Sequence, residues 1–207
     1  MIKLINDDCM NIMKDYEDDH FDLAICDPPY GINRMNTGGK PKHLGFSQWE
    51  KKEWDNHIPK KEYFDELFRV SKNQIIWGGN YMVEHLKASM GWVFWYKGQQ
   101  GLSWSDGELA YTSFDKALRQ VTINRCEIKK DGTIHPTQKP VKLYKWLLHN
   151  YSEKGQRILD THLGSGSIAI ACHYYGVDLL GIEIDKEYYD KAKERIDQLT
   201  RQETLFK

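Results

Sequence analysis

Four consecutive residues, Asp27-Pro28-Pro29-Tyr30, combine groups that could hold a planar amine. They follow the apolar run 21–26, which predicts a buried strand ending at Asp27. Two prolines fix the backbone and remove amide donors, which leaves a carbonyl oxygen and the Asp27 carboxylate as acceptors for two amino protons. The Tyr30 ring could stack on the plane that carries the amine. For these residues taken alone, the alternative is an Asp-Pro turn that only ends a strand.

A second candidate site begins where the apolar stretch 157–160 runs into Gly164-Ser165-Gly166-Ser167. Glycines between a strand and a helix let a ligand approach backbone amides at the positive helix end. The next apolar stretch ends at Glu183, at the spacing of about 20 residues where a carboxylate can accept ribose hydroxyls. The third glycine of a dinucleotide site and the Gly-Lys-Ser/Thr of a P-loop are absent. An adenosine with a charged tail fits, which suggests S-adenosylmethionine; a tight strand–helix turn without ligand is the alternative.

The two motifs together predict methyl transfer to an amine. An exocyclic amine held by Asp27 and a fixed carbonyl has its nitrogen lone pair out of conjugation and directed at a methyl donor. The reaction would then be a direct in-line transfer that depends on positioning more than on acid–base chemistry.

The composition is that of an ordinary globular protein, and its 207 residues allow one domain with a core. No apolar run approaches the roughly 20 residues that span a bilayer, and the acidic start is unlike a signal peptide. We therefore expect a cytoplasmic protein with no membrane association. The four cysteines (Cys9, Cys26, Cys126 and Cys172) form no C-x-x-C pair, so neither a metal site nor a disulfide framework is expected.

The formal net charge is −1, but the charges are unevenly distributed. Residues 34–61 carry seven Lys and Arg against three Asp and Glu, and residues 116–142 carry seven against two. Such segments suit a basic cleft for phosphates, or they are two solvated loops. The aromatics Trp49 and Trp54 could fill a vacated base stack or pin the loop to the core. The predicted nucleic-acid-binding residues are Arg34, Lys40, Lys42, Lys51, Lys52, Arg119, Arg125, Lys129 and Lys130.

Strands and helices alternate along the chain. Strands are predicted at 21–26, 74–77, 92–96, 108–114, 157–160 and 178–182, and helices at 60–71, 81–90, 140–151, 168–175 and 187–199. This alternation predicts an α/β fold with a mostly parallel sheet, helices on both faces, and ligands at the carboxyl ends of the strands. Residues 1–207 should form one domain with two long loops, at about 31–58 and 115–134. Trp77, Trp92 and Trp95 are expected in the core.

The chain resembles the DNA amino-methyltransferases of the adenine-N6/cytosine-N4 group, in the beta arrangement, where the catalytic motif precedes the cofactor motif. The resemblance implies a Rossmann-like S-adenosylmethionine-dependent methyltransferase fold, S-adenosyl-L-methionine as cofactor, and DNA methylation of the restriction-modification kind. Asp27 to Tyr30 matches the catalytic motif in the form typical of adenine-N6 enzymes. Cytosine-N4 enzymes more often have Ser in the first position.

The resemblance also assigns residues to the cofactor. Asn6-Asp7-Asp8-Cys9 matches the family's Gly-Asp-Cys element, with Asp8 in the place that contacts the adenine amine of the cofactor. His135 to Pro140 matches the element before the helix that flanks the methionine end. Within it, Lys139 would either be solvated at the helix start or approach the ligand. The predicted cofactor-binding residues are Asp8, Cys9, Asp27, Lys139, Asp160, Thr161, His162, Leu163, Gly164, Ser165, Gly166, Glu183 and Ile184.

The chain departs from the family pattern in two places. Asp160-Thr161-His162 replaces the usual Asp-Pro-Phe, so His162 stands where a Phe packs near the cofactor, although the turn should persist. The separate target-recognition region is missing, and only the short basic segment 115–134 stands in its place. Recognition would then fall to that segment and to loop 31–58, with a very short site or a homodimer as the consequence.

The leading hypothesis is therefore a site-specific DNA methyltransferase that acts on N6 of adenine in a flipped-out base. Cytosine N4 or an RNA base is the second hypothesis, with the same chemistry. A non-catalytic nucleic-acid-binding partner subunit with a methyltransferase fold is the third. Degenerate partners of that kind usually lose the tetrad or the cofactor acid, and this chain keeps both.

Overall fold

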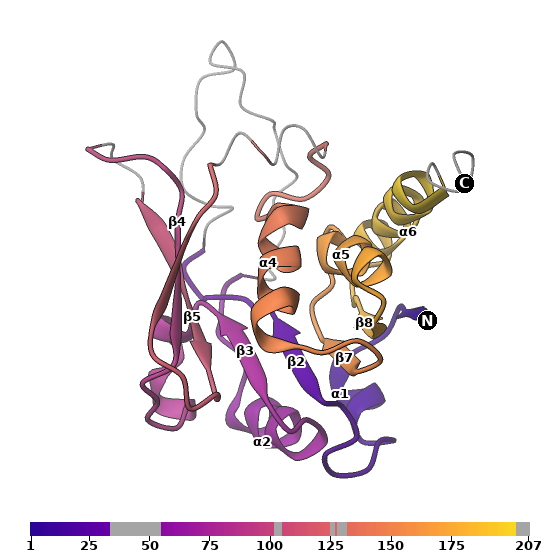
Figure 1. The fold of residues 1–207 in the computed structure, drawn as a ribbon. Helices are drawn as coiled ribbons and strands as arrows, with labels where there is room; N and C mark the ends of the chain where they lie inside the picture. The colour runs from indigo at the N-terminus through magenta and orange to yellow at the C-terminus, as the bar shows by residue number, and fades with distance from the viewer. Residues whose placement is uncertain (34–54, 102–104, 125–126, 128–131, 202–207) are drawn as a thin grey trace.

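A mixed β-sheet of eight strands forms the centre of the fold (Figure 1). The computed structural model describes residues 1–33, 55–101, 105–124, 127 and 132–201. Its elements, in chain order, are β1 (Ile2–Ile5), α1 (Cys9–Met13), β2 (Leu23–Cys26), α2 (Lys61–Val70), β3 (Gln74–Trp77), the 3₁₀ turns η3 (Gly79–Tyr81) and η4 (Val83–His85), β4 (Trp92–Tyr96), β5 (Gly107–Thr112), β6 (Arg119–Thr122), α4 (Val141–Tyr151), β7 (Arg157–Asp160), α5 (Ser167–Tyr175), β8 (Asp178–Ile182) and α6 (Lys186–Arg201).

The strand order is β1-β8-β7-β2-β3-β5-β4-β6. Neighbours pair in parallel except at β5, which runs antiparallel to both β3 and β4. The carboxyl ends of β1, β8, β7, β2 and β3 therefore lie along one edge. Because β5 is reversed, its first residues lie at that same edge beside the end of β4, where Glu108 pairs with Trp95. This edge positions every residue of the site described below.

Side chains of β2 alternate between the two faces of the sheet, as the period of two in a strand requires. Leu23 and Ile25 pack in one core cluster with α4, α5 and α6. Ala24 and Cys26 pack in the other cluster with α1 and α2. Helices α4 and α5 lie side by side in front of the sheet (Figure 1). The predicted α/β fold with helices on both faces is confirmed.

Helix α2 confirms the helix that the sequence predicts at residues 60–71. Its buried side chains, Tyr63, Phe64, Leu67 and Val70, recur at helical spacing and face the sheet. Glu62 in the first turn and Arg69 in the last turn complement the helix dipole. The helix ends where the backbone becomes extended at the next residue. Helix α2 lies between β2 and β3 in the chain, and the two strands pair in parallel.

Two predicted elements are wrong. The helix predicted at 81–90 is only the 3₁₀ turns η3 and η4, because Tyr81, Val83 and Met90 remain exposed and give a helix no apolar face to bury. The predicted loop 115–134 contains β6, whose Val121 is buried and whose backbone pairs in parallel with β4. A single buried apolar residue, Val121, is too short a pattern to predict a strand from the sequence.

The tryptophans predicted in the core behave differently from one another. Trp77 and Trp95 are fully buried, whereas Trp92 is only half-buried against the cluster that contains α2. Across the described ranges, the helices are all too short or too polar to cross a bilayer.

Candidate active site

Acidic side chains follow four neighbouring parallel strands at the point where each strand ends. Asp8 follows β1, Glu183 follows β8, Asp160 closes β7, and Asp27 follows β2. Because these strands are adjacent in the order β1-β8-β7-β2, their carboxyl ends form one row. The structure thereby brings the predicted cofactor residues and the predicted catalytic tetrad to one edge of the sheet.

The tetrad is held in a nearly closed environment. The Tyr30 hydroxyl donates a hydrogen bond of 2.7 Å to Oδ1 of Asp27. Burial raises the pKa of Tyr30 well above its ordinary value, so the hydroxyl remains a donor. Burial also raises the pKa of the Asp27 carboxyl, with the positive charge of Lys139 opposing the shift. Asp27 is therefore a carboxylate with an increased affinity for a proton.

Lys139 lies inside the site. Its side chain is 2% exposed and forms an ion pair with Asp27. Its Nζ also donates to the Tyr30 hydroxyl at 3.2 Å and lies 3.4 Å from Oε2 of Glu108. The interpretation of Lys139 as solvated at the helix start is wrong, because the segment before α4 packs on the sheet and directs the lysine over the ring of Trp77, 5.2 Å away.

Glu108 and Lys97 complete this charged cluster, and sequence reasoning missed both. Nζ of Lys97 lies 2.6 Å from Oε1 of Glu108, and the Lys97 side chain is 9% exposed. Oε2 of Glu108 also lies 3.4 Å from the Tyr30 hydroxyl. In the sequence, the available signals were a lysine, Lys97, just after the strand β4 and a glutamate, Glu108, early in the next strand, β5. The two side chains come together because β5 runs antiparallel to β4.

Three further residues fix the position of Tyr30. Oδ1 of the buried Asp55 accepts hydrogen bonds from the backbone N–H of Tyr30 (2.9 Å) and of Gly31 (3.1 Å). Gly78 packs against the Tyr30 ring with no side chain between them. Tyr81 stacks on that ring with centroids 5.3 Å apart and an interplanar angle of 18°. The tyrosine is thus oriented by backbone, by packing and by an aromatic neighbour.

The glycine turn after β7 is held from two sides. The Gly164 N–H donates to Oε2 of Glu183 at 2.8 Å, and the Asp185 N–H donates to Oε1 at 2.9 Å. Glu183 thereby links the glycine turn to the end of β8. From α6, the buried Arg195 donates to the Ser165 carbonyl at 2.8 Å. Arg195 is a third residue that sequence reasoning missed, since arginine on a closing helix is usually solvated.

His162 occupies the position where the family usually has Phe. Its ring meets Tyr63 edge-on at 5.4 Å, and its Nδ1 lies 2.9 Å from Oγ1 of Thr161. Burial lowers the pKa of His162 to about 4, with the negative charge of Asp8 opposing the shift. The imidazole is therefore neutral at neutral pH, and it packs as an aromatic ring next to the predicted cofactor residues.

The charges at this edge suit a positively charged ligand. Burial, with smaller contributions from the nearby carboxylates of Asp27 and Glu183, raises the pKa of Asp160 to about 8. Carboxyl groups placed close together are stabilised by a cation among them. A sulfonium with an α-ammonium group has that charge, whereas a nucleotide phosphate does not. The residues present therefore fit S-adenosyl-L-methionine.

The remaining predicted site residues differ in their exposure. Among the predicted cofactor residues, Cys9 is half-buried, and burial raises the pKa of its thiol to about 12. Leu163 is buried, whereas Ile184 is 65% exposed. In the catalytic tetrad, Pro28 is buried and Pro29 is half-buried.

Only one of the predicted nucleic-acid-binding residues is described by the structure. Arg119 is exposed on β6, four strands away from β2 in the sheet order. The others lie outside the described residues: Arg34, Lys40, Lys42, Lys51, Lys52, Arg125, Lys129 and Lys130.

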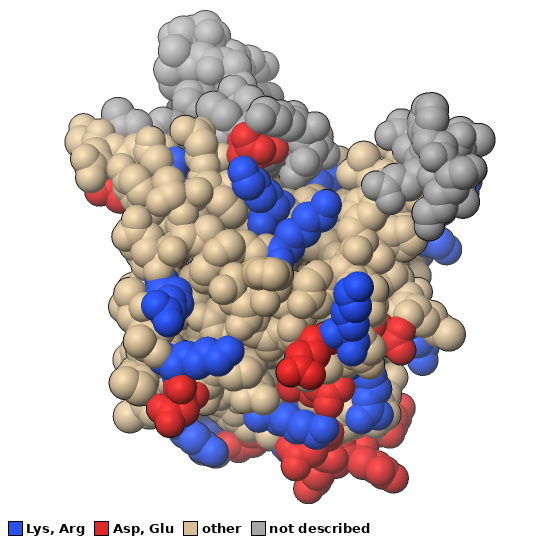
Figure 2. All heavy atoms as spheres, viewed as in Figure 1, with Lys and Arg blue, Asp and Glu red and all other residues tan. Residues whose placement is uncertain are grey.

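Two acidic residues of the first 22 positions, Asp18 and Asp22, form ion pairs at the opposite edge of the sheet. Asp22 precedes β2 and pairs with Lys72, which precedes β3, at 2.7 Å. Asp18 pairs with Arg69 at the end of α2. In Figure 2 the acidic side chains are concentrated in the lower part of the visible face, while lysines and arginines are spread across it.

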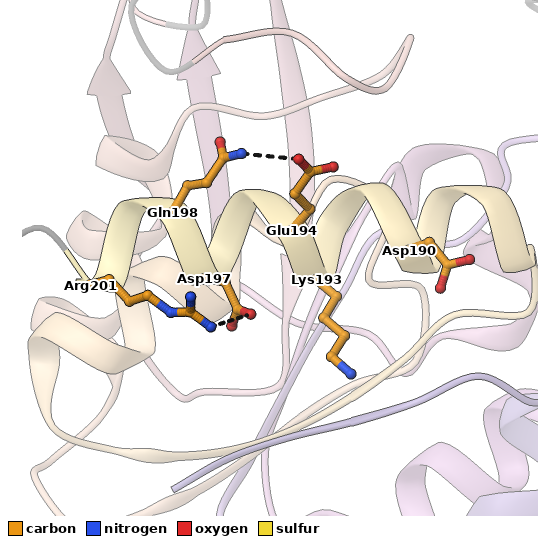
Figure 3. A pocket seen from close by; sticks show the side chains of 6 residues that line it. All are labelled: Asp190, Lys193, Glu194, Asp197, Gln198 and Arg201. Atoms are coloured by element: carbon orange, nitrogen blue, oxygen red, sulfur yellow. Dashed lines mark hydrogen bonds and ion pairs between the residues drawn. The ribbon is translucent and has the colours of Figure 1, made fainter.

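A hollow along the solvent side of α6 is separate from this site (Figure 3). Its charged side chains interact within the helix: Arg201 pairs with Asp197 at 3.1 Å, and Gln198 donates to Glu194 at 3.1 Å. None of the residues that line it was predicted to bind a ligand.

A family of DNA methylases, the N6/N4 methyltransferases, matches residues 83–194, which is more than half of the chain. The chain belongs to this family. The matched segment includes Lys139, the glycine turn and Glu183, but it begins after the tetrad. The resemblance on which the family was inferred from the sequence is confirmed.

Curated relatives of this methylase span nearly all of it. The Type II methyltransferase M.HpaI of Haemophilus parainfluenzae is 27% identical over 94% of the chain and 74% of its own length. M2.DpnII of Streptococcus pneumoniae is 21% identical over 94% of the chain and 89% of its own length.

Two solved structures share the fold of the methylase. The M1.HpyAVI–SAM complex superposes with a TM-score of 0.65 at 21% identity, covering 94% of the chain and all of its own. The cytosine-N4-specific PvuII DNA methyltransferase superposes with a TM-score of 0.61 at 11% identity, covering 97% of the chain and 92% of its own. The predicted fold class is confirmed.

Proposed function

We propose that the chain transfers a methyl group from S-adenosyl-L-methionine to N6 of adenine in DNA, and that the target base enters the site at Asp27 after leaving the duplex. The observation that carries the proposal is the hydrogen-bonded pair of Asp27 and Tyr30 at the end of β2, next to β7 and its glycine turn. An amine acceptor and an adenosine site are thereby adjacent.

The cofactor supplies an electrophilic methyl group on a sulfonium. Glu183 would accept its ribose hydroxyls, and Asp8 would accept from its adenine amine. Backbone groups of the turn at Gly164 to Gly166 would lie against its tail. His162 and Leu163 would enclose it without adding charge, since the imidazole is neutral. The cofactor-binding role of these residues is part of the proposal.

Asp27 would accept one amino proton, and the carbonyl of Pro28 would accept the other. Tyr30 would stack on the base and hold its amine against these acceptors. The methyl carbon would bond to the amine nitrogen as its bond to sulfur breaks, so that the cofactor leaves as a neutral thioether. The nitrogen would become positively charged and then lose a proton. The raised pKa of Asp27 favours transfer of that proton to its carboxylate. Burial of the tetrad excludes competing water.

DNA is the proposed partner because the family that the chain matches is one of DNA methylases, and a solved structure with the same fold is named a DNA methyltransferase. The predicted nucleic-acid-binding lysines and arginines would supply the phosphate contacts. Residues 31–58 and 115–134 are proposed to contact the DNA, and pairing into a homodimer would supply further contacts.

Cytosine N4 is the second candidate target. The structure of a cytosine-N4-specific enzyme has the same fold, so the fold favours neither base. Asp in the first position of the tetrad supports adenine.

The test is a transfer assay with labelled S-adenosyl-L-methionine and DNA, followed by digestion and identification of the methylated base. N6-methyladenine is expected, and N4-methylcytosine would contradict the adenine assignment. Asp27→Ala should lower the rate by roughly 100-fold or more, because the amine loses its acceptor. Cofactor binding, measured by calorimetry, should be largely kept. Normal transfer by this variant would contradict the role of the tetrad.

A further inference from the structure

In this structure an ammonium group occupies the surroundings that the proposed function reserves for the amine of a base. Lys139 forms an ion pair with Oδ2 of Asp27, while Tyr30 donates to Oδ1 of the same carboxylate. Both Asp27 oxygens therefore already accept hydrogen bonds from the chain. Lys139 also donates to the Tyr30 hydroxyl, so it lies between the two residues that would receive the base.

The positive charge of Lys139 opposes the proposed reaction while it stays on Asp27. The amine nitrogen becomes positively charged as it bonds to carbon, and the Asp27 carboxylate is the group placed to stabilise that charge. An ammonium group paired with the Asp27 carboxylate cancels most of the electrostatic field that the carboxylate exerts at the amine. Lys139 must therefore leave Asp27 when the base binds, and it needs another acceptor inside the protein because it is 2% exposed.

Glu108 is placed to be that acceptor. Its Oε2 lies 3.4 Å from Nζ of Lys139 and 3.4 Å from the Tyr30 hydroxyl, so both present partners of Asp27 are already close to it. Lys97 holds the other oxygen, Oε1, at 2.6 Å and keeps the carboxylate turned toward the site. A short movement of Lys139 from Asp27 to Glu108 keeps the buried ammonium paired with a carboxylate, and leaves Asp27 with the Tyr30 hydroxyl and the incoming amine as its donors.

We propose, on the basis of the proposed function, that Glu108 is a positioning residue that takes Lys139 from Asp27 when the amino base enters. In the free protein, Lys139 pairs with the half-buried Asp27 and lies close to Glu108, which Lys97 also neutralises. In the complex with the base, Lys139 pairs with Glu108, and Asp27 regains its charge for the amine. Glu108 touches neither the base nor the cofactor in this scheme and acts through Lys139.

The test is a double-mutant cycle on single-turnover methyl transfer to DNA. Glu108→Gln removes the negative charge that would receive Lys139, so transfer should fall by roughly 100-fold, while calorimetric cofactor affinity stays unchanged. Glu66→Gln, which breaks the 2.8 Å ion pair with Arg69 far from the site, is the matched control and should transfer like wild type. The loss in Glu108→Gln should appear in the rate at saturating DNA and not in the KM for DNA.

The second arm removes the lysine. On a Lys139→Met background there is no ammonium to relocate, so adding Glu108→Gln should change the rate by only about twofold or less. An equal loss on both backgrounds would overturn the proposal, because a merely structural role of Glu108 would not depend on Lys139. Should Glu108→Gln fail to fold, Lys97→Gln releases the same carboxylate, and its effect should depend on Lys139 in the same way.

The two proposals fail in different ways. A wild-type protein that transfers no methyl group to DNA would contradict the proposed function and this inference with it. A wild-type protein that transfers normally, beside a Glu108→Gln variant of equal rate, would contradict only the role of Glu108.

Discussion

Gly78 and Tyr30 are packed so closely that a Cβ atom added at Gly78 would lie 2.2 Å from Cε1 of the tyrosine ring. Gly78 has a φ of 67° and directly follows β3, the neighbour of the strand that ends at the tetrad. The absence of a side chain at this one position therefore sets how near the Tyr30 ring can lie to the sheet.

The first prediction is that Gly78→Ala displaces Tyr30 and lowers methyl transfer by roughly 100-fold, because small misplacements of a substrate-holding group are costly. Gly155→Ala is the matched control, since Gly155 has a φ of 82° and nothing within 4 Å of an added Cβ. Both variants bear the strain of a left-handed alanine, of order 1–3 kcal/mol. Equal activities in the two variants would show that close packing on Tyr30 is unimportant.

The second prediction concerns Asp55, which accepts from the N–H groups of Tyr30 and Gly31 through a single oxygen. Asp55→Ala leaves these donors without that acceptor, which should cost about 1–3 kcal/mol of unfolding free energy and reduce transfer. Asp55→Asn keeps a carbonyl oxygen in the same place and should retain most of the unfolding free energy and most of the methyl transfer. Urea unfolding and the transfer assay measure the two effects. An alanine variant as active as the asparagine variant would contradict this role.

The third prediction follows from the pKa of Asp160, which burial raises from 3.8 to about 8. Between these values the folded protein keeps a proton that the unfolded chain has lost, so stability falls as the pH rises through this window. Asp160→Asn resembles the protonated acid and does not titrate. Thermal unfolding should therefore show the wild type losing stability relative to Asp160→Asn from about pH 4 to about pH 8. A constant difference would show that the carboxyl is ionised throughout.

The fourth prediction has the opposite sign. Burial lowers the pKa of His162 from 6.5 to about 4, so between these values the unfolded chain binds a proton that the folded protein does not. Stability is therefore lost as the pH falls through this window. His162→Phe places the usual family residue there and removes the titration. The stability of the wild type relative to His162→Phe should decrease on acidification, and parallel pH profiles would contradict the neutral imidazole.

Much of the sheet could be predicted because its strands are continuous apolar runs. β3 and β7 are bounded as expected, since each is buried on both faces and followed by a polar or glycine residue. The strand β1 has only four residues, and Lys3 in its middle is exposed, so its pairing with β8 was not visible in the sequence.

The candidate site was partly predictable for a similar reason. Glu183 was found because its partner, the turn at Gly164, lies at a fixed separation along the chain, and the structure joins them by a hydrogen bond. Glu108 and Lys97 were missed because their contact with Lys139 depends on where an antiparallel strand enters the sheet. The burial of Lys139 itself follows from tertiary packing, which overrides the usual solvation of lysine.

The hydrogen bond of 3.0 Å from the Asn33 N–H to the Asp55 carbonyl has a consequence for how this protein can change. It joins the chain on both sides of residues 34–54 immediately beside the tetrad. The free energy of joining two ends of a flexible chain grows by only about 0.6 kcal/mol when the number of residues between them doubles. We therefore expect Asn33 and Asp55 to stay joined, and the adjacent tetrad to keep its place, when the number of residues between them changes.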